Sequence, residues 1–133
     1  ALFGYDGPCK NIHGHTYRLS VTILGEPIQE GGNPKLGMVV DFTDFKQIVK
    51  THVIDVFDHT LVLKSGTPHE KIAGLRDNFE RVFFSEYQPS CENLLLDMLN
   101  RINNHLPDTV VLKNVRLEET PTSYAEWFLE DNL

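Results

Sequence analysis

The chain has 133 residues, with 12 Lys and Arg side chains against 19 Asp and Glu, and a formal net charge of −7 at pH 7. This length is close to the commonest size of a single domain, so we expect one hydrophobic core in one domain over residues 1–133. The hydrophobic fraction of 41% is too high for a disordered chain. The acidic balance argues against nucleic acid as a partner, and no apolar run approaches the roughly 20 residues that span a membrane.

The two cysteines, Cys9 and Cys91, are too few for a disulfide framework. Free thiols are favoured over a single disulfide between them. The first residues, Ala1 to Asp6, contain neither a basic region nor an apolar stretch of the signal-peptide kind. We therefore expect a cytoplasmic protein.

The first elements in chain order are extended. Residues 17–24 alternate apolar and polar side chains for most of their length, which predicts a half-buried strand. Residues 25–37 contain four glycines and two prolines, which is typical of a long turn or an exposed hairpin tip. Residues 38–40, Met-Val-Val, are predicted to form a short buried strand.

From Phe42 the apolar spacing becomes helical, and Asp41 or Thr43 is a candidate N-cap. We expect the apolar stripe of this helix to pack in the core. Its members are Phe42, Phe45, Ile48, Val49, Val53 and Val56.

In the second half, residues 59–63 and 79–84 are predicted to be short extended pieces on either side of a polar loop, 64–78. Ser90 is a candidate N-cap for a second helix, whose apolar face would be formed by Leu95, Met98, Leu99 and Ile102. Residues 110–119 and 124–129 are predicted to be two further strands. The order predicts an α+β domain, with an antiparallel four-stranded sheet and two helices on one face.

The densest chemical signal is Cys9-Lys10-Asn11-Ile12-His13-Gly14-His15. Histidines two apart on an extended segment point to the same side, so His13 and His15 can reach one metal ion. The alternative is a pair of edge histidines bonded to backbone. Cys9 is predicted to lie in a loop, where it is either a reactive thiolate or a buried inert thiol. Cys91, at the start of a helix, is interpreted as inert.

Two further carboxylates attract attention. Asp58 precedes His59, and a carboxylate beside an imidazole suits general acid–base work if the pair lies at a turn; the alternative is helix capping and surface polarity. Glu119 follows Val115 and Leu117 in one strand row. A carboxylate ending an inward row would match a ligand with two adjacent N–H donors, unless the strand ends earlier and leaves Glu119 in water.

Five motifs occur in order and together resemble the 6-pyruvoyl-tetrahydropterin synthase and 6-carboxy-tetrahydropterin synthase family over almost the whole chain. They are Cys-x-x-x-His-Gly-His-x-Tyr (9–17), Val-Asp-Phe-x-x-Phe-Lys (40–46), Asp-His (58–59), Pro-Ser-x-Glu-Asn (89–93) and Glu-Thr (119–120). The resemblance implies a tunnelling fold, in which sheets of several subunits close into a barrel. It also implies a cytoplasmic homohexamer, a dimer of trimers, with active sites between subunits.

The same resemblance implies a zinc-dependent lyase acting on 7,8-dihydroneopterin triphosphate. His13 and His15 match two Zn²⁺ ligands and Cys9 the catalytic thiol. Asp58 with His59 matches an acid–base pair contributed across a subunit interface. Glu119 matches the pterin anchor, and Ser90 and Glu92 match substrate-binding positions.

The family's first zinc histidine has no counterpart here, so we expect it on a strand upstream of Ala1. The three-residue gap between Cys9 and His13 resembles the 6-carboxy branch of queuosine biosynthesis, and the 6-pyruvoyl product is the alternative.

Two other functions remain open. One is a thiol hydrolase with Cys9 as nucleophile, His59 as base and Asp58 as its orienting carboxylate. The other is a non-catalytic pterin-binding module that retains Glu119.

Overall fold

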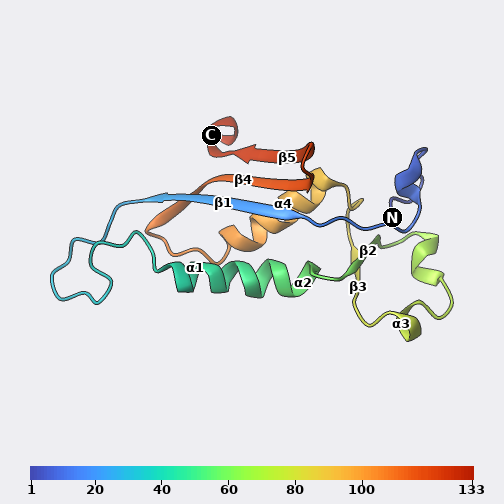
Figure 1. Cartoon of the computed structure of the whole chain (residues 1–133), viewed down its shortest axis with the longest axis horizontal. Coiled ribbons are helices and arrows are strands. Elements are labelled where there is room, and N and C mark those ends of the chain that lie inside the picture. The colour runs from blue at the N-terminus through green and yellow to red at the C-terminus, as the bar shows by residue number, and fades with distance from the viewer.

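A three-stranded antiparallel sheet in the order β1-β4-β5 forms the centre of the protein, in a computed structural model that describes residues 1–133 (Figure 1). β1 spans Arg18–Gly25, β4 spans Val110–Thr120 and β5 spans Ser123–Phe128. Helix α4 (Cys91–Asn103) and a helical segment over residues 42–57 pack against one face of the sheet. The predicted α+β class with an antiparallel sheet is confirmed.

A β-bulge in β4 lets this strand present apolar side chains to the helices on both sides of the bulge. Thr22 of β1 pairs with Asn114 and Ile23 pairs with Leu112, so Lys113 is an extra residue in β4. Because side chains alternate along a strand, the extra residue shifts the alternation by one. Even-numbered residues face the helices before the bulge and odd-numbered residues face them after it. The buried residues of β4 are Val110, Leu112, Val115 and Leu117.

Helix α4 supplies most of the other side of the core. The Ser90 hydroxyl accepts a hydrogen bond from the Asn93 N–H at 3.3 Å, which confirms Ser90 as the N-cap. The predicted apolar face of this helix is also confirmed, since its four members and Leu94 are all buried. Together with Val53 they pack against β4.

The helical segment over residues 42–57 has three parts. They are α1 (Phe42–Val49), a π-helical stretch (Lys50–Ile54) and α2 (Asp55–Phe57). Asp41 caps the start by accepting from the Thr43 N–H at 2.8 Å. The prediction that the whole stripe lies in the core is wrong for most of its members. Phe42 is 76% exposed, and Phe45, Ile48 and Val56 neither belong to the buried cluster nor pack against it. The buried cluster of the core reaches this segment only from Val49 onward, about two turns further along.

The remaining strands differ from the prediction. β2 (Leu61–Lys64) and β3 (Val82–Ser85) form a separate two-stranded parallel sheet, so the expected four-stranded antiparallel sheet is not found. Both strands are nearly continuous apolar runs, and such runs are typical of parallel strands covered on both faces. Alternation along one strand carries no information about its partner, which is why the sequence did not reveal this pairing.

The segments between these elements are mostly irregular. Residues 38–40 form no strand, because only two backbone hydrogen bonds join Ile28 to Met38 and Gly37 across the long turn. The predicted loop 64–78 contains a 3-10 turn, Pro68–Lys71, and the short helix α3 (Leu75–Asn78). A 3-10 turn, Leu129–Asn132, follows β5. No helix in residues 1–133 combines the length and the hydropathy needed to cross a membrane.

Candidate active site

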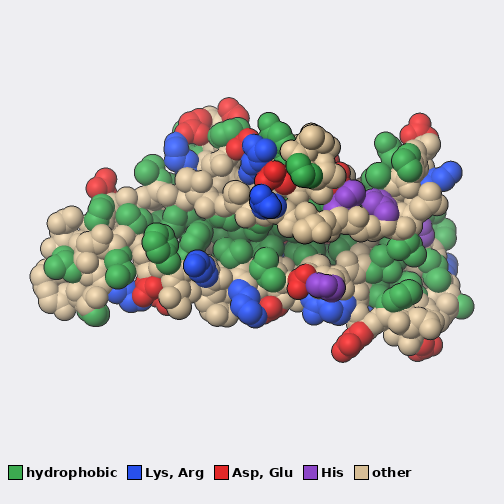
Figure 2. Space-filling model, in the orientation of Figure 1, with side chains coloured by type: hydrophobic (Ala, Val, Ile, Leu, Met, Phe, Trp, Pro, Cys, Tyr) green, Lys and Arg blue, Asp and Glu red, His purple; other side chains and the backbone are tan.

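A cavity of about 680 Å³ opens where the N-terminal segment, the stretch leading into β1, the turn before β2, the N-terminus of α4 and the end of β4 converge. Cys9, His13, His15, His59 and Glu119 all line it. Its apolar wall includes side chains of α4, among them Leu94 and Met98. Histidine side chains gather toward the end of the molecule that carries the N-terminal segment (Figure 2). The fold therefore brings together side chains far apart in the sequence, such as Cys9 and Glu119, which are 110 positions apart.

His13 and His15 lie on the extended segment that leads into β1, and their rings meet edge to face with centroids 5.1 Å apart. The Nδ1 atom of His13 lies 2.8 Å from the Asn11 carbonyl oxygen. Since a carbonyl only accepts, this nitrogen carries the proton and leaves Nε2 with a free lone pair. The Nε2 atom of His15 is buried without a hydrogen-bond partner. Both rings are thus available to a ligand.

The donor set fits a metal ion only in part. Two imidazoles on one side of an extended segment are suitable zinc ligands, and the unpartnered Nε2 of His15 is the kind of atom that a metal would satisfy. Within residues 1–133, however, no three His, Cys, Asp or Glu side chains lie close enough together to hold an ion. A complete catalytic zinc site normally has three protein ligands. Residues 1–133 therefore offer two candidate ligands, His13 and His15, one fewer than such a site requires.

Glu119 lies at the end of β4, where a second irregularity in the pairing with β5 leaves it as an extra residue between Glu118 and Thr120. Its side chain is 29% exposed and approaches the His15 Nε2 atom at 3.5 Å. It therefore follows Leu117 toward the helices, as its place in the strand row predicts, and it is not left fully in water. Glu119 also lines a smaller hollow of about 250 Å³ beside the β4–β5 turn.

The negative charge of Glu119 acts on its neighbours. Burial, and then the Glu119 carboxylate, raise the pKa of Tyr17 to about 12, so the phenol keeps its proton at neutral pH. The same two causes, burial first, raise the pKa of the Cys91 thiol. Cys91 therefore stays a thiol, which agrees with its interpretation as inert.

Tyr17 is a cavity residue that the chemical interpretation of the sequence did not single out. Its ring meets the His15 ring edge to face, with centroids 5.8 Å apart. The signal that could have identified it is the spacing of His13, His15 and Tyr17. Residues two apart on an extended segment share a side, so all three point into the cavity.

Cys9 lies in a 3-10 turn, Pro8–Lys10, and is half-buried at the cavity wall. Its carbonyl oxygen accepts a hydrogen bond from the Leu2 N–H at 2.7 Å, which closes the N-terminal segment into a loop. The thiol is free. The expectation of a loop position is met, and the role of this thiol stays a prediction.

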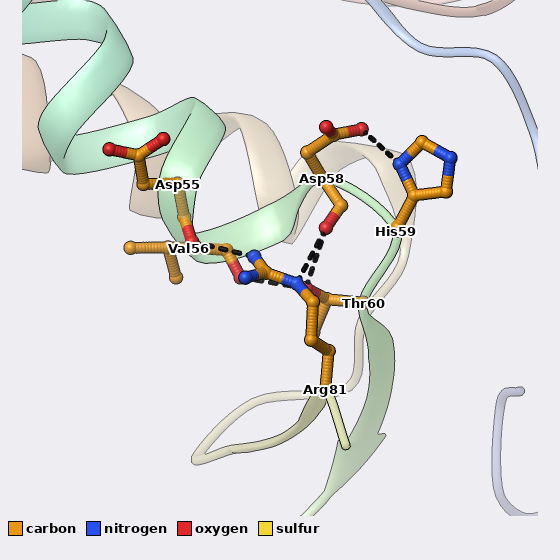
Figure 3. A network of polar contacts seen from close by, with 6 residues as sticks. All are labelled: Asp55, Val56, Asp58, His59, Thr60 and Arg81. Carbon is orange, nitrogen blue, oxygen red and sulfur yellow. Dashed lines mark hydrogen bonds and ion pairs between the residues drawn. The ribbon is translucent and has the colours of Figure 1, made fainter. Parts of the chain in front are cut away.

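Asp58 and His59 lie at the turn between α2 and β2, the position at which an adjacent pair can cooperate (Figure 3). His59 has a φ of 53°, and its Nδ1 atom lies 2.8 Å from the Asp58 carboxylate. Arg81 holds the turn by donating to the carbonyls of Asp55 and Asp58 at 2.6 and 2.9 Å and to the Thr60 hydroxyl at 3.2 Å.

The two side chains of this pair are open to solvent. His59 is 88% exposed and Asp58 62% exposed. The imidazole borders the cavity of its own chain, and the carboxylate does not. With Nδ1–H directed at Asp58, the Nε2 atom of His59 is left free to exchange a proton.

Ser90 and Glu92, the two other predicted substrate contacts, line the cavity at the N-terminus of α4. The Ser90 hydroxyl already accepts the hydrogen bond that caps the helix. It can bind a ligand only through its O–H donor or its second lone pair. Glu92 is exposed and has no ion-pair partner in the structure. Like Glu119, it lines both the cavity and the smaller hollow.

A half-buried cavity with two neighbouring histidines, a free thiol, an oriented imidazole and a partly buried carboxylate is typical of an enzyme-like small-molecule site. A sequence model of the 6-pyruvoyl tetrahydropterin synthase family matches residues 1–130, and the chain belongs to this family. The resemblance deduced from the five motifs is thereby confirmed.

Individual relatives agree with this membership. The chain is 35% identical over 128 residues to a Haemophilus influenzae protein named 6-carboxy-5,6,7,8-tetrahydropterin synthase, an alignment covering 95% of this chain and 88% of the relative. It is 33% identical over 129 residues to a Rickettsia bellii protein of the same name, covering 94% and 88%. A crystal structure of an uncharacterized Wolinella succinogenes protein matches with a TM-score of 0.71 at 20% identity, covering 91% of this chain and 81% of that one. This last likeness supports the fold alone.

Proposed function

We propose that this protein is a zinc-dependent lyase that converts 7,8-dihydroneopterin triphosphate and one water to 6-carboxy-5,6,7,8-tetrahydropterin, releasing acetaldehyde and triphosphate, in the biosynthesis of queuosine. The observation that carries the proposal is one cavity lined by Cys9, His13, His15, His59 and Glu119. Relatives named for the 6-carboxy product, aligned over most of both chains, favour it over the 6-pyruvoyl product.

Glu119 is proposed to anchor the pterin. A carboxylate can accept two parallel N–H bonds, and the amino group and adjacent ring N–H of a pterin present such a pair of donors. Its half-buried position at the end of β4 would strengthen these bonds relative to water. The Tyr17 phenol and the apolar wall from α4 would enclose the ring system.

His13 and His15 are proposed to hold Zn²⁺ together with one further ligand. When bound, the metal would polarise the side-chain hydroxyls of the substrate and acidify the neighbouring C–H groups. The Nδ1–H of His13, which donates to the Asn11 carbonyl, fixes the ring so that Nε2 presents its lone pair. His15 contributes an Nε2 atom that has no hydrogen-bond partner and lies 3.5 Å from the Glu119 carboxylate.

Cys9 and His59 are proposed to move protons. A thiolate at Cys9 would accept a proton from one side-chain carbon of the substrate and return it to a neighbouring position. The Nε2 atom of His59 would hold or release a second proton, while Asp58 stabilises the imidazolium through Nδ1–H. Such proton shifts generate the reduced ring and prepare the loss of triphosphate.

We also propose that the chain works as a homohexamer, a dimer of trimers. The exposure of Asp58 and His59 supports a role for this pair at a surface that a second subunit covers, since a general acid–base pair works best when shielded from bulk water.

A mass-spectrometric product assay with purified protein, zinc and 7,8-dihydroneopterin triphosphate tests the proposal. The expected product is 6-carboxy-tetrahydropterin, lost in Cys9→Ser and retained in a His105→Ala control, which removes a histidine outside the cavity. A pyruvoyl product would reverse the choice of branch. Turnover that survives exhaustive chelation would refute the zinc dependence, and tight pterin binding without turnover would favour a binding module.

A further inference from the structure

The N-terminal segment that carries Cys9 is attached to the rest of the protein at Phe3. The Phe3 carbonyl accepts a hydrogen bond from the Gln88 side-chain Nε2 at 2.8 Å. The Phe3 ring meets the His69 ring edge to face, with centroids 5.3 Å apart. We call Phe3, His69 and Gln88 the Phe3 clamp.

Both partners of Phe3 are themselves fixed. The Gln88 carbonyl accepts from the Ser90 N–H at 2.8 Å and from the Asn93 side chain at 3.0 Å, which ties it to the start of α4. His69 follows Thr67, whose hydroxyl donates to the Lys64 carbonyl at 2.9 Å and accepts from the His69 N–H at 3.3 Å. Since Thr67 is only 8% exposed, the loop is anchored at the end of β2.

The clamp includes two polar atoms that are buried without partners, Nδ1 of His69 and Oε1 of Gln88. A buried unpaired polar atom destabilises the fold by an amount similar to a lost hydrogen bond. Neither side chain is therefore fully satisfied where it lies: Gln88 bonds Phe3 through Nε2 but leaves Oε1 unpaired, and His69 leaves Nδ1 unpaired. What the two share is contact with Phe3.

The clamp acts on Cys9 through a short connection. The Leu2 N–H donates to the Cys9 carbonyl at 2.7 Å, so the residue next to Phe3 in the chain is bonded to Cys9 itself. Leu2 and Cys9 both line the cavity. Phe3 is thus connected to the backbone of Cys9, which carries the thiol, through Leu2 and one hydrogen bond.

We infer that His69 and Gln88 are positioning residues, which hold Phe3 so that the Cys9 thiol faces the cavity. This assigns a purpose to loop 64–78, which carries His69 and otherwise lies apart from the site. The inference rests on the proposed function only in taking Cys9 as the reacting thiol. The location of the thiol can be measured without any turnover.

The test is the rate of alkylation of each cysteine by iodoacetamide, resolved by mass spectrometry of the digested protein. Cys91 serves as an internal reference, because it is half-buried in the same cavity and lies on α4 rather than on the N-terminal segment. In His69→Ala and Gln88→Ala we expect the Cys9 rate to change by about 3- to 10-fold, while the Cys91 rate stays within about 2-fold of the parent.

Two matched variants sharpen the test. His69→Phe keeps an aromatic ring against Phe3 and removes the unpaired nitrogen, so it should retain the parent Cys9 rate and unfold at no lower urea concentration. His105→Ala removes a histidine ring that stacks on His52 with centroids 3.4 Å apart, away from the clamp, and should leave both thiols unchanged.

An unchanged Cys9 rate in both alanine variants, or equal changes at both thiols, would overturn the inference. In the lyase assay, His69→Ala should lower kcat by about 3- to 10-fold with a smaller change in KM, and His69→Phe should restore it. If alkylation responds selectively but the parent shows no turnover, the clamp stands and the proposed lyase activity fails.

Discussion

Glu119→Gln is the sharpest single test of the pterin anchor. The substitution keeps the size of the side chain but replaces one carboxylate oxygen by an NH₂ group, which would face a ligand N–H and leave that donor without an acceptor. Loss of a charge-assisted bond costs about 1.5–3 kcal/mol, and the 29% exposure of Glu119 places the expected value near 2 kcal/mol. Since about 1.4 kcal/mol corresponds to a factor of ten, the Kd should rise about 30-fold.

The assay is a calorimetric titration with 7,8-dihydroneopterin, which carries the pterin edge but no triphosphate. Glu118→Gln is the matched control. Glu118 precedes Glu119 in β4 and does not border the cavity. Its Oε1 atom lies 3.9 Å from the Nη2 atom of Arg116. We expect its Kd to stay within about 2-fold of the parent. Equal, small changes in both variants would refute the anchoring role and the geometric argument behind it.

Three further predictions concern the turn and the core. Asp58→Asn should lower kcat/KM on the order of 10-fold or more by weakening the orientation of His59, with the free energy of unfolding unchanged within about 0.5 kcal/mol in a urea titration. Arg81→Ala removes three hydrogen bonds to the same turn and should lower that free energy by about 1–2 kcal/mol; an unchanged urea midpoint would contradict this. Burial and a hydrogen bond to Asp97 raise the pKa of Tyr87, so the folded protein keeps a proton that the unfolded chain loses above about pH 10. Stability should therefore fall as pH rises above that value, and Tyr87→Phe should make the fall shallower in thermal melts across alkaline pH.

The parts of the fold that the sequence predicts well are those in which neighbouring residues decide the outcome. The α4 helix follows from the Ser90 cap and an apolar face at helical spacing, both of which are local. The parallel pairing of β2 with β3 depends on partners about 20 positions apart, such as Leu61 and Val82. Alternation within one strand does not specify such a partner.

In the candidate site, too, some features follow from local sequence and others depend on contacts between distant residues. The common side of His13 and His15 follows from a two-residue spacing, and the direction of Glu119 follows from its place after Leu117. The segment that carries Cys9 is joined to the rest of the protein by a hydrogen bond between Gln88 and Phe3, which are 85 positions apart. No short pattern in the sequence encodes that contact.

The bulge at Lys113 has a consequence for how β4 can change in length. Substitutions in this strand alter one side chain, but deletion of the extra residue would exchange inside and outside for every position on one side of it. Either Leu112 would turn toward water or Glu119 would turn out of the cavity. Adding or losing one residue in β4 would therefore be more damaging than any single replacement, because it reverses the face to which the other side chains point. The long turn over residues 25–37 has no such alternation to preserve and can absorb a change in length.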